Sequence, residues 1–115
     1  QEAFKAMVYF SDHGEDLGIG HTPDNVTYPM ARIPFWISVS DIFAQDNEDV
    51  IKAMRSNIDR PFTNDFLFDI VCGLTKMTSN PFYRSGFDVT SKYFDIKPED
   101  VMILNTYKAL DDPNY

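Results

Sequence analysis

A nearly continuous apolar run that stops at a polar turn constrains the fold of this chain more than any other feature. Residues 4–11 (FKAMVYFS) are rich in β-formers, and Asp12, His13 and Gly14 follow them. A strand that is apolar along its whole length is typical of a parallel sheet covered on both faces. Gly14 can adopt backbone angles that are closed to other residues. We therefore expect a buried strand that ends in a turn at residues 12–14.

The rest of the pattern places further strands and helices along the chain. A Gly- and Pro-rich loop is expected over residues 14–29, and a second strand over residues 32–39. Pro34 restricts that strand to a strand start or an edge position. Apolar periodicity predicts helices over residues 46–58 and 64–77 and a last short strand at residues 101–104, which together indicate an α/β layer.

The two expected helices each carry one apolar face, and a loop-like segment over residues 78–100 is rich in aromatic residues. Asp46 or Asn47 is the expected N-cap of the first helix and Thr63 that of the second. The expected apolar faces comprise Val50, Ile51, Met54 and Ile58 in the first helix and Leu67, Ile70, Val71 and Leu74 in the second. The aromatic residues expected to pin the loop-like segment to the body are Phe82, Tyr83, Phe87, Tyr93 and Phe94.

Charge and cysteine content exclude several classes of function. The net charge of −8 over 115 residues argues against nucleic-acid binding and against attachment to anionic lipid, both of which need Lys and Arg. Cys72 is the single cysteine, so neither an internal disulfide nor a cysteine zinc cluster is possible, and we expect it to be buried. No apolar run reaches the length of about 18 residues needed to span a membrane.

Both histidines of the chain lie in the window after the first strand, at His13 and His21. Ligands of open α/β sheets bind beyond the carboxyl ends of strands, where Asp12 and His13 are placed. A carboxylate oxygen and an imidazole nitrogen suit zinc, and His21 can supply a third ligand or a hydrogen bond to substrate. The spacing alone also fits a plain polar turn in which Asp12 caps the loop backbone.

Longer stretches of the sequence resemble a known family. The segments VYFSDHGEDLG, the following GH and RIPFWISVS are similar to the C-terminal part of the sulfatase domain of the alkaline phosphatase superfamily. The closest group is the bacterial phosphoethanolamine transferases that modify lipopolysaccharide, and RPFTNDFLFDIVCGLTKMTSNPFY resembles their next segment. The match covers roughly residues 5–94. It implies a partial α/β/α layered sheet, with residues 1–115 as the C-terminal fragment of a sulfatase-like catalytic domain.

The resemblance also implies roles for individual residues. Asp12 and His13 match the zinc-binding Asp-His pair of the family, and His21 matches a catalytic loop histidine that contacts the transferred phosphate. The loop between the two histidines is shorter than in the enzymes that act on lipid A, and is closer to members that act on core sugars. The nucleophilic threonine of the family precedes this motif, whereas Thr22 and Thr27 follow it.

The function implied for the parent protein is transfer of phosphoethanolamine from phosphatidylethanolamine to a lipopolysaccharide core sugar or to lipid A, through a covalent threonine intermediate. The implied cofactor is zinc or another divalent metal. The chain does not begin with Met. We expect a soluble segment of a protein of the bacterial inner membrane whose catalytic domain faces the periplasm. The segment alone should be inactive and should self-associate through open sheet edges. Two alternatives are a fragment of a sulfatase or phosphodiesterase-type hydrolase and a non-catalytic binding domain.

Overall fold

The computed structural model describes residues 5–104 and 106–114, so that Phe4 of the expected first strand lies outside the described residues. It combines helices with two small antiparallel sheets, which confirms a chain of mixed α and β structure. In chain order the elements are β1 (Ala6–Phe10), α1 (Tyr28–Ala31), β2 (Phe35–Val39), α2 (Asp41–Asp46), α3 (Glu48–Ser56), α4 (Leu67–Leu74), β3 (Met102–Ile103) and β4 (Tyr107–Lys108), with short 3-10 turns at Asn64–Phe66, Ser85–Phe87, Pro98–Asp100 and Ala109–Asp111.

Strands β1 and β2 form an antiparallel ribbon, so the expectation of a buried strand in a parallel sheet is wrong. Ala6 lies opposite Val39, and Phe10 lies opposite Phe35. Four of the five residues of β1 are exposed. Parallel neighbours need a long crossover, which usually contains a helix. The segment between the two strands is mostly loop, with only the four residues of α1, and the chain returns antiparallel instead. The second strand lies within the expected range of 32–39 but begins at Phe35, directly after Pro34.

The two faces of this ribbon differ in what covers them. Val8, Ile37 and Val39 belong to the face that packs against the hydrophobic core. Tyr9 and Trp36, which lie opposite each other, are on the outer face and stack at a centroid distance of 5.0 Å. The ribbon thus carries apolar side chains on both faces, which explains the unbroken apolar run in the sequence.

The expected helix over residues 46–58 is α3, which begins after Asn47, although the Asn47 side chain makes no capping hydrogen bond to it. A second helix, α2, precedes it and was not expected. The Ser40 hydroxyl accepts a hydrogen bond from the Phe43 N–H, and this N-cap starts α2 at residue 41. Asn47 separates the helices, and its Nδ2 donates to the Phe43 carbonyl at 2.8 Å. Val50 is buried and Met54 is half-buried, as expected, but Ile58 lies beyond the helix end and is 77% exposed.

Helix α4 is shorter than the expected helix over residues 64–77. A 3-10 turn at Asn64–Phe66 leads into it, and the Thr63 side chain makes no capping hydrogen bond. Ile70 and Leu74 are buried as expected, whereas Val71 is exposed. The helix ends because Lys76 adopts a φ of 59°, which is incompatible with helical continuation. Cys72 is buried, as the sequence predicted.

The hydrophobic core lies between the ribbon and the helices. The buried cluster contains Phe43, Val50, Phe66, Ile70, Leu74, Val89 and Phe94. Phe94 and the half-buried Phe87 both pack against Phe66, with centroid distances of 6.3 and 4.9 Å, and anchor the segment over residues 78–100 as expected. The same expectation is wrong for Phe82 and Tyr93, whose side chains are exposed.

Two buried carboxylates hold this segment. Asp69 joins it to α4, and Asp88 makes hydrogen bonds within it. Asp69 accepts hydrogen bonds from the backbone N–H of Arg84 and from its guanidinium, both at 2.7 Å. Asp88 accepts from the Tyr83 hydroxyl at 2.8 Å and from the N–H and hydroxyl of Thr90. Burial raises the pKa of Asp88 and, together with the hydrogen bond to Asp88, raises the pKa of Tyr83 to about 12.

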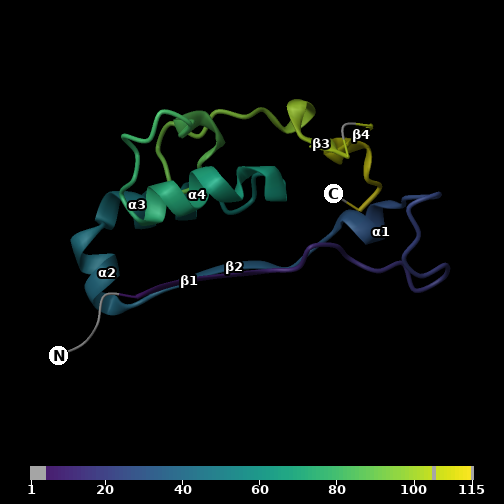
Figure 1. Cartoon of the computed structure of the whole chain (residues 1–115), viewed down its shortest axis with the longest axis horizontal. Coiled ribbons are helices and arrows are strands. Elements are labelled where there is room, and N and C mark those ends of the chain that lie inside the picture. The colour runs from purple at the N-terminus through teal and green to yellow at the C-terminus, as the bar shows by residue number, and fades with distance from the viewer. Residues whose placement is uncertain (1–4, 105, 115) are drawn as a thin grey trace.

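The ribbon runs along the long axis of the molecule, with α2, α3 and α4 over one face near the N-terminal end (Figure 1). The segment over residues 78–100 passes above α4. Helix α1, the loop that follows β1, and the β3–β4 hairpin gather at the opposite end of the ribbon. The end of β1 therefore faces the C-terminal part of the chain and not the helical core.

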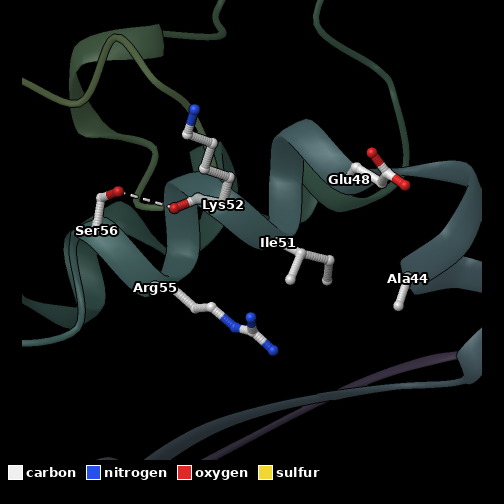
Figure 2. Close-up of a pocket in the computed structure, with 6 residues that line it drawn as sticks. All are labelled: Ala44, Glu48, Ile51, Lys52, Arg55 and Ser56. Carbon is white, nitrogen blue, oxygen red and sulfur yellow. Dashed lines mark hydrogen bonds between the residues drawn. The ribbon is translucent and has the colours of Figure 1, made fainter.

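A shallow pocket of about 420 Å³ lies along α3 (Figure 2). Ile51 and Arg55 point toward the ribbon, and Lys52 points to the opposite side of the helix. The Ser56 hydroxyl donates to the Lys52 carbonyl at 2.9 Å. Glu48 and Lys52 have the i, i+4 spacing of an ordinary solvated helix face, and this pocket has no convergent polar groups that would indicate a ligand site.

We expect Asp88→Ala to lower the free energy of unfolding by about 2 kcal/mol at neutral pH, because it leaves the buried Thr90 N–H without its acceptor. Because the pKa of Asp88 is raised in the folded state, its contribution to the free energy of unfolding is fully present below its ordinary pKa of 3.8. This contribution declines as the pH rises through the pKa of Asp88 in the folded protein. The difference between wild type and variant should therefore be larger at pH 4 than at pH 8. Urea unfolding at both pH values measures it.

The exposed Asp59→Ala serves as the control for this experiment, and its unfolding midpoint should stay within the error of the wild type. An Asp88→Ala midpoint equal to that of the control would show that the hydrogen bonds of Asp88 do not stabilise the segment over residues 78–100.

We also expect the chain to self-associate through the ribbon. Within the described residues no third strand pairs with β1 or β2, and isolated two-stranded ribbons are marginally stable. Trp36→Lys should shift the chain toward monomer, because it places a charge on the exposed apolar face. Tyr93→Lys, at a similarly exposed aromatic residue away from the ribbon, should leave the mass unchanged. Size-exclusion chromatography with light scattering measures this, and a wild-type monomer at high concentration would refute it.

Candidate metal centre

The structure brings the two histidines of the chain together. The His13 and His21 rings stack with a centroid distance of 3.8 Å and an interplanar angle of 18°. His13 lies just beyond the end of β1, and His21 lies in the loop that returns from it. Both side chains are exposed. The loop thus places two imidazole ligands side by side at the end of the first strand.

Glu15 completes a group of three potential ligands. One ligand atom each of His13, Glu15 and His21 lies within 4.8 Å of the others. Glu15 was not among the expected ligands, although it stands two residues after His13 in the same polar window. Whether the Glu15 carboxylate reaches the two histidines depends on how the chain turns after Gly14. The spacing of these residues in the sequence does not specify that turn.

The hydrogen bond made by His13 defines which ring nitrogen is free. Nδ1 lies 2.7 Å from the Gly14 carbonyl oxygen. Because a carbonyl oxygen can only accept, Nδ1 of the neutral ring carries the proton and donates it. Nε2 then keeps its lone pair and is the nitrogen available to a metal, in the arrangement typical of metal-bound histidines.

Asp12 lies at the edge of this group and not within it. Its Oδ1 accepts a hydrogen bond from the His13 backbone N–H at 3.1 Å and lies 3.9 Å from His13 Nε2. The carboxylate therefore caps the turn, which is one of the two roles that the sequence allowed. Its assignment as a metal ligand stays a prediction.

Two further side chains hold the turn that carries His13. The Ser11 hydroxyl donates to the His13 carbonyl at 2.7 Å. Asn64, at the start of the 3-10 turn before α4, donates from Nδ2 to the carbonyls of Ser11 and Asp12 at 3.3 and 3.5 Å. Its buried Oδ1 has no hydrogen-bond partner among the described residues. The turn after β1 is thus attached to a segment that lies far away in the chain.

Gly14 is required for a different reason from the one expected. Its N–H donates to the Met30 carbonyl at 2.6 Å, and a Cβ at this position would collide with the carbonyl oxygens of Pro29 and Arg32. The constraint is this close approach to α1. A positive φ is found instead at Gly20, where φ is 75°. Gly14 thus packs the loop against α1, and Gly20 allows the chain to turn just before His21.

A cavity of about 810 Å³ opens beside the histidines. Asp12, His13 and His21 contribute to one part of its lining. Much of the remaining wall is apolar and comes from β2, the segment before α4 and the C-terminal part of the chain. These wall residues include Phe35, Phe62, Val101, Met102, Ile103 and Leu104. The group of potential ligands therefore borders a space large enough for a small-molecule substrate.

An ion pair joins the C-terminal segment to the end of α1 at this cavity. Arg32 Nε donates to Asp112 Oδ2 at 2.6 Å, and this hydrogen bond holds the pKa of Asp112 below its ordinary value. The Tyr28 hydroxyl donates to the Lys108 carbonyl at 3.4 Å. Burial, followed by the charges of Asp111 and Asp112, raises the pKa of Tyr28.

The three side chains have the chemistry of a transition-metal site. Two imidazole nitrogens and one carboxylate oxygen are the ligand set of several catalytic zinc sites, which keep a fourth position open. Donors around a tetrahedral zinc ion lie about 3.4 Å apart at the usual bond lengths. Side chains exposed to solvent can close the present spacing by changing rotamer, so the residues fit a zinc ion.

We compared the chain with known proteins and found no relative. No protein-family model, curated protein or solved structure matches the chain. In the part of the chain that the structure describes, none of the helices combines the length and the apolar character needed to cross a membrane.

We expect zinc to bind this chain with a dissociation constant in the micromolar range or weaker, because only three exposed side chains hold it. Glu15→Ala should weaken binding by about tenfold, since it removes the one carboxylate of the group. Glu99→Ala, an exposed glutamate in another turn, should leave the affinity unchanged. Isothermal titration calorimetry of both variants measures the effect.

His13→Ala and Asp12→Ala extend the same titration. The first should abolish measurable binding, and the second should have a smaller effect than Glu15→Ala. Stoichiometric binding at sub-micromolar concentration that survives His13→Ala would refute this assignment of the site.

Proposed function

We propose that this chain contributes part of the metal site of a zinc-dependent phosphoethanolamine transferase. The observation that carries this proposal is the group formed by His13, Glu15 and His21 at the end of β1 and beside the large cavity. The resemblance of the segments around His13 and β2 to that family supports it. No other cluster with comparable ligand chemistry is found among the described residues.

A bound zinc ion would supply Lewis-acid stabilisation of negative charge on phosphoryl oxygens. His13 would hold it through Nε2, with the proton on Nδ1 kept in place by the Gly14 carbonyl. Glu15 would provide the anionic ligand. His21 would either complete the ligand set or donate a hydrogen bond to the transferred phosphoryl group. Asp12 would support this arrangement from the edge of the site.

The remaining parts of the proposal concern the parent protein. A threonine of the parent protein, outside residues 1–115, would attack the phosphorus of phosphatidylethanolamine, release diacylglycerol and form a phosphothreonine ester. A hydroxyl of a lipopolysaccharide sugar or of lipid A would then attack the same phosphorus and release the threonine. The ribbon and helices would belong to the layered sheet of a sulfatase-like domain that faces the periplasm. The isolated chain would then have a metal site without a nucleophile.

The experiment uses the complete reading frame that contains this sequence. We expect the purified protein, supplied with zinc, to transfer phosphoethanolamine from phosphatidylethanolamine to lipopolysaccharide, as detected by mass spectrometry of the acceptor. His13→Ala should abolish transfer, while the distant Asn80→Ala should retain it. The isolated chain of residues 1–115 should show no turnover of either lipid or phosphodiester.

The other outcomes separate the alternatives. Zinc-dependent hydrolysis of a sulfate ester or a phosphodiester without transfer would assign the protein to the hydrolases of the same superfamily. Zinc binding with neither transfer nor hydrolysis would favour a non-catalytic binding domain. Turnover by the isolated chain would contradict the assignment of the nucleophile to another segment.

A further inference from the structure

The contact between Asp16 and Thr27 closes the loop that carries His21. The Thr27 hydroxyl donates to Asp16 Oδ2 at 2.8 Å across eleven positions of sequence. The other carboxylate oxygen of Asp16 accepts from the Gly18 N–H at 2.9 Å. One side chain therefore joins the start of the loop to its end, where α1 begins at residue 28.

The backbone of Asp16 makes a second set of contacts within the same loop. Its carbonyl oxygen accepts from the Gly20 N–H at 2.6 Å, and the two residues form an isolated antiparallel bridge. Gly20 adopts the positive φ that this tight return requires. His21 follows directly. Asp16 lies three residues after His13, and Gly20 lies directly before His21. The contacts between Asp16 and Gly20 therefore fix the position of His21 relative to His13.

Few other contacts hold His21 among the residues that the structure describes. Its side chain is exposed, and its ring stacks on that of His13. Within the same described part of the chain, the side-chain hydrogen bond in this loop that does not involve Asp16 is the long one of 3.4 Å from the Asp24 N–H to the Thr22 hydroxyl. A loop without the Asp16–Thr27 bond would regain the conformational freedom that closure removes, and His21 would leave His13 for part of the time.

We infer that Asp16 and Thr27 are positioning residues that hold His21 against His13 and so preassemble the metal site. The inference rests on the proposed function, because it assigns a role in the same site. Neither residue is a ligand in it. Outer contacts that orient metal ligands are commonly worth 10- to 100-fold in metal affinity (order of magnitude). In this loop, loss of the Asp16–Thr27 hydrogen bond would lower the metal affinity by separating the His13 and His21 rings.

The test replaces the hydroxyl of Thr27 while keeping the shape of the side chain. We expect Thr27→Val to weaken cobalt and zinc binding by about tenfold, whereas Thr27→Ser, which keeps the donor, should restore wild-type affinity. Thr22→Val is the matched control in the same loop and should bind as the wild type does. Cobalt absorption in the visible range reports the number of ligands, and Thr27→Val should show the spectrum of a site with fewer nitrogen ligands.

A second readout needs no metal. In the metal-free wild type, nuclear Overhauser effects between the His13 and His21 ring protons should be observed, and Thr27→Val should lose them while the remaining amide resonances stay in place. Asp16→Ala should also lose them, because it removes the acceptor of Thr27 together with that of the Gly18 N–H. The double variant should be no worse than Asp16→Ala alone, since the bond that Thr27→Val removes is already absent there.

The two readouts separate failure of this inference from failure of the proposed function. If the wild type binds no metal but Thr27→Val still loses the ring contact, the positioning role stands and the metal-dependent function is refuted. If Thr27→Val keeps both the ring contact and the affinity of the wild type, the positioning role is refuted. A Thr27→Ser variant that behaves like Thr27→Val would refute it as well, because the hydroxyl would then not be the group responsible.

Discussion

The pairing of β1 with β2 is the interaction on which the rest of this structure depends. Its register places Val8 opposite Ile37 and so directs one apolar face toward the helices that follow β2. Because the two strands run in opposite directions, the end of β1 and the start of β2 lie at the same end of the ribbon. The loop with both histidines and α1 are therefore held there, away from the hydrophobic core that stabilises the ribbon.

Local features of the fold could be predicted from the sequence, whereas long-range features could not. The strand starting after Pro34, the buried Cys72 and the apolar face at Ile70 and Leu74 follow from local chemistry and periodicity. The sheet direction does not, because an unbroken apolar run fits both a doubly covered strand and an open ribbon with apolar faces. Helix α2 was not expected, because it is short and is held by the side-chain hydrogen bonds of Ser40 and Asn47 at its two ends.

The candidate site shows the same division between local and long-range information. The sequence pointed to the window with His13 and His21, since both histidines of the chain lie in it. It did not reveal Glu15 as a partner, because the direction of that carboxylate depends on the close approach of Gly14 to α1. It also gave no indication of the link between Asn64 and the carbonyls of the turn, which joins segments more than fifty positions apart.

That link has a consequence for the order in which the molecule folds. Contacts between residues far apart in sequence form late, because the chain must first lose the entropy of closing the intervening segment. The turn after β1 leaves the ribosome early, yet the amide that fixes it belongs to the segment before α4 and is synthesised later. The histidines can thus approach each other locally before their turn is anchored. During synthesis the turn therefore lacks the hydrogen bonds from Asn64 until the segment before α4 has been made.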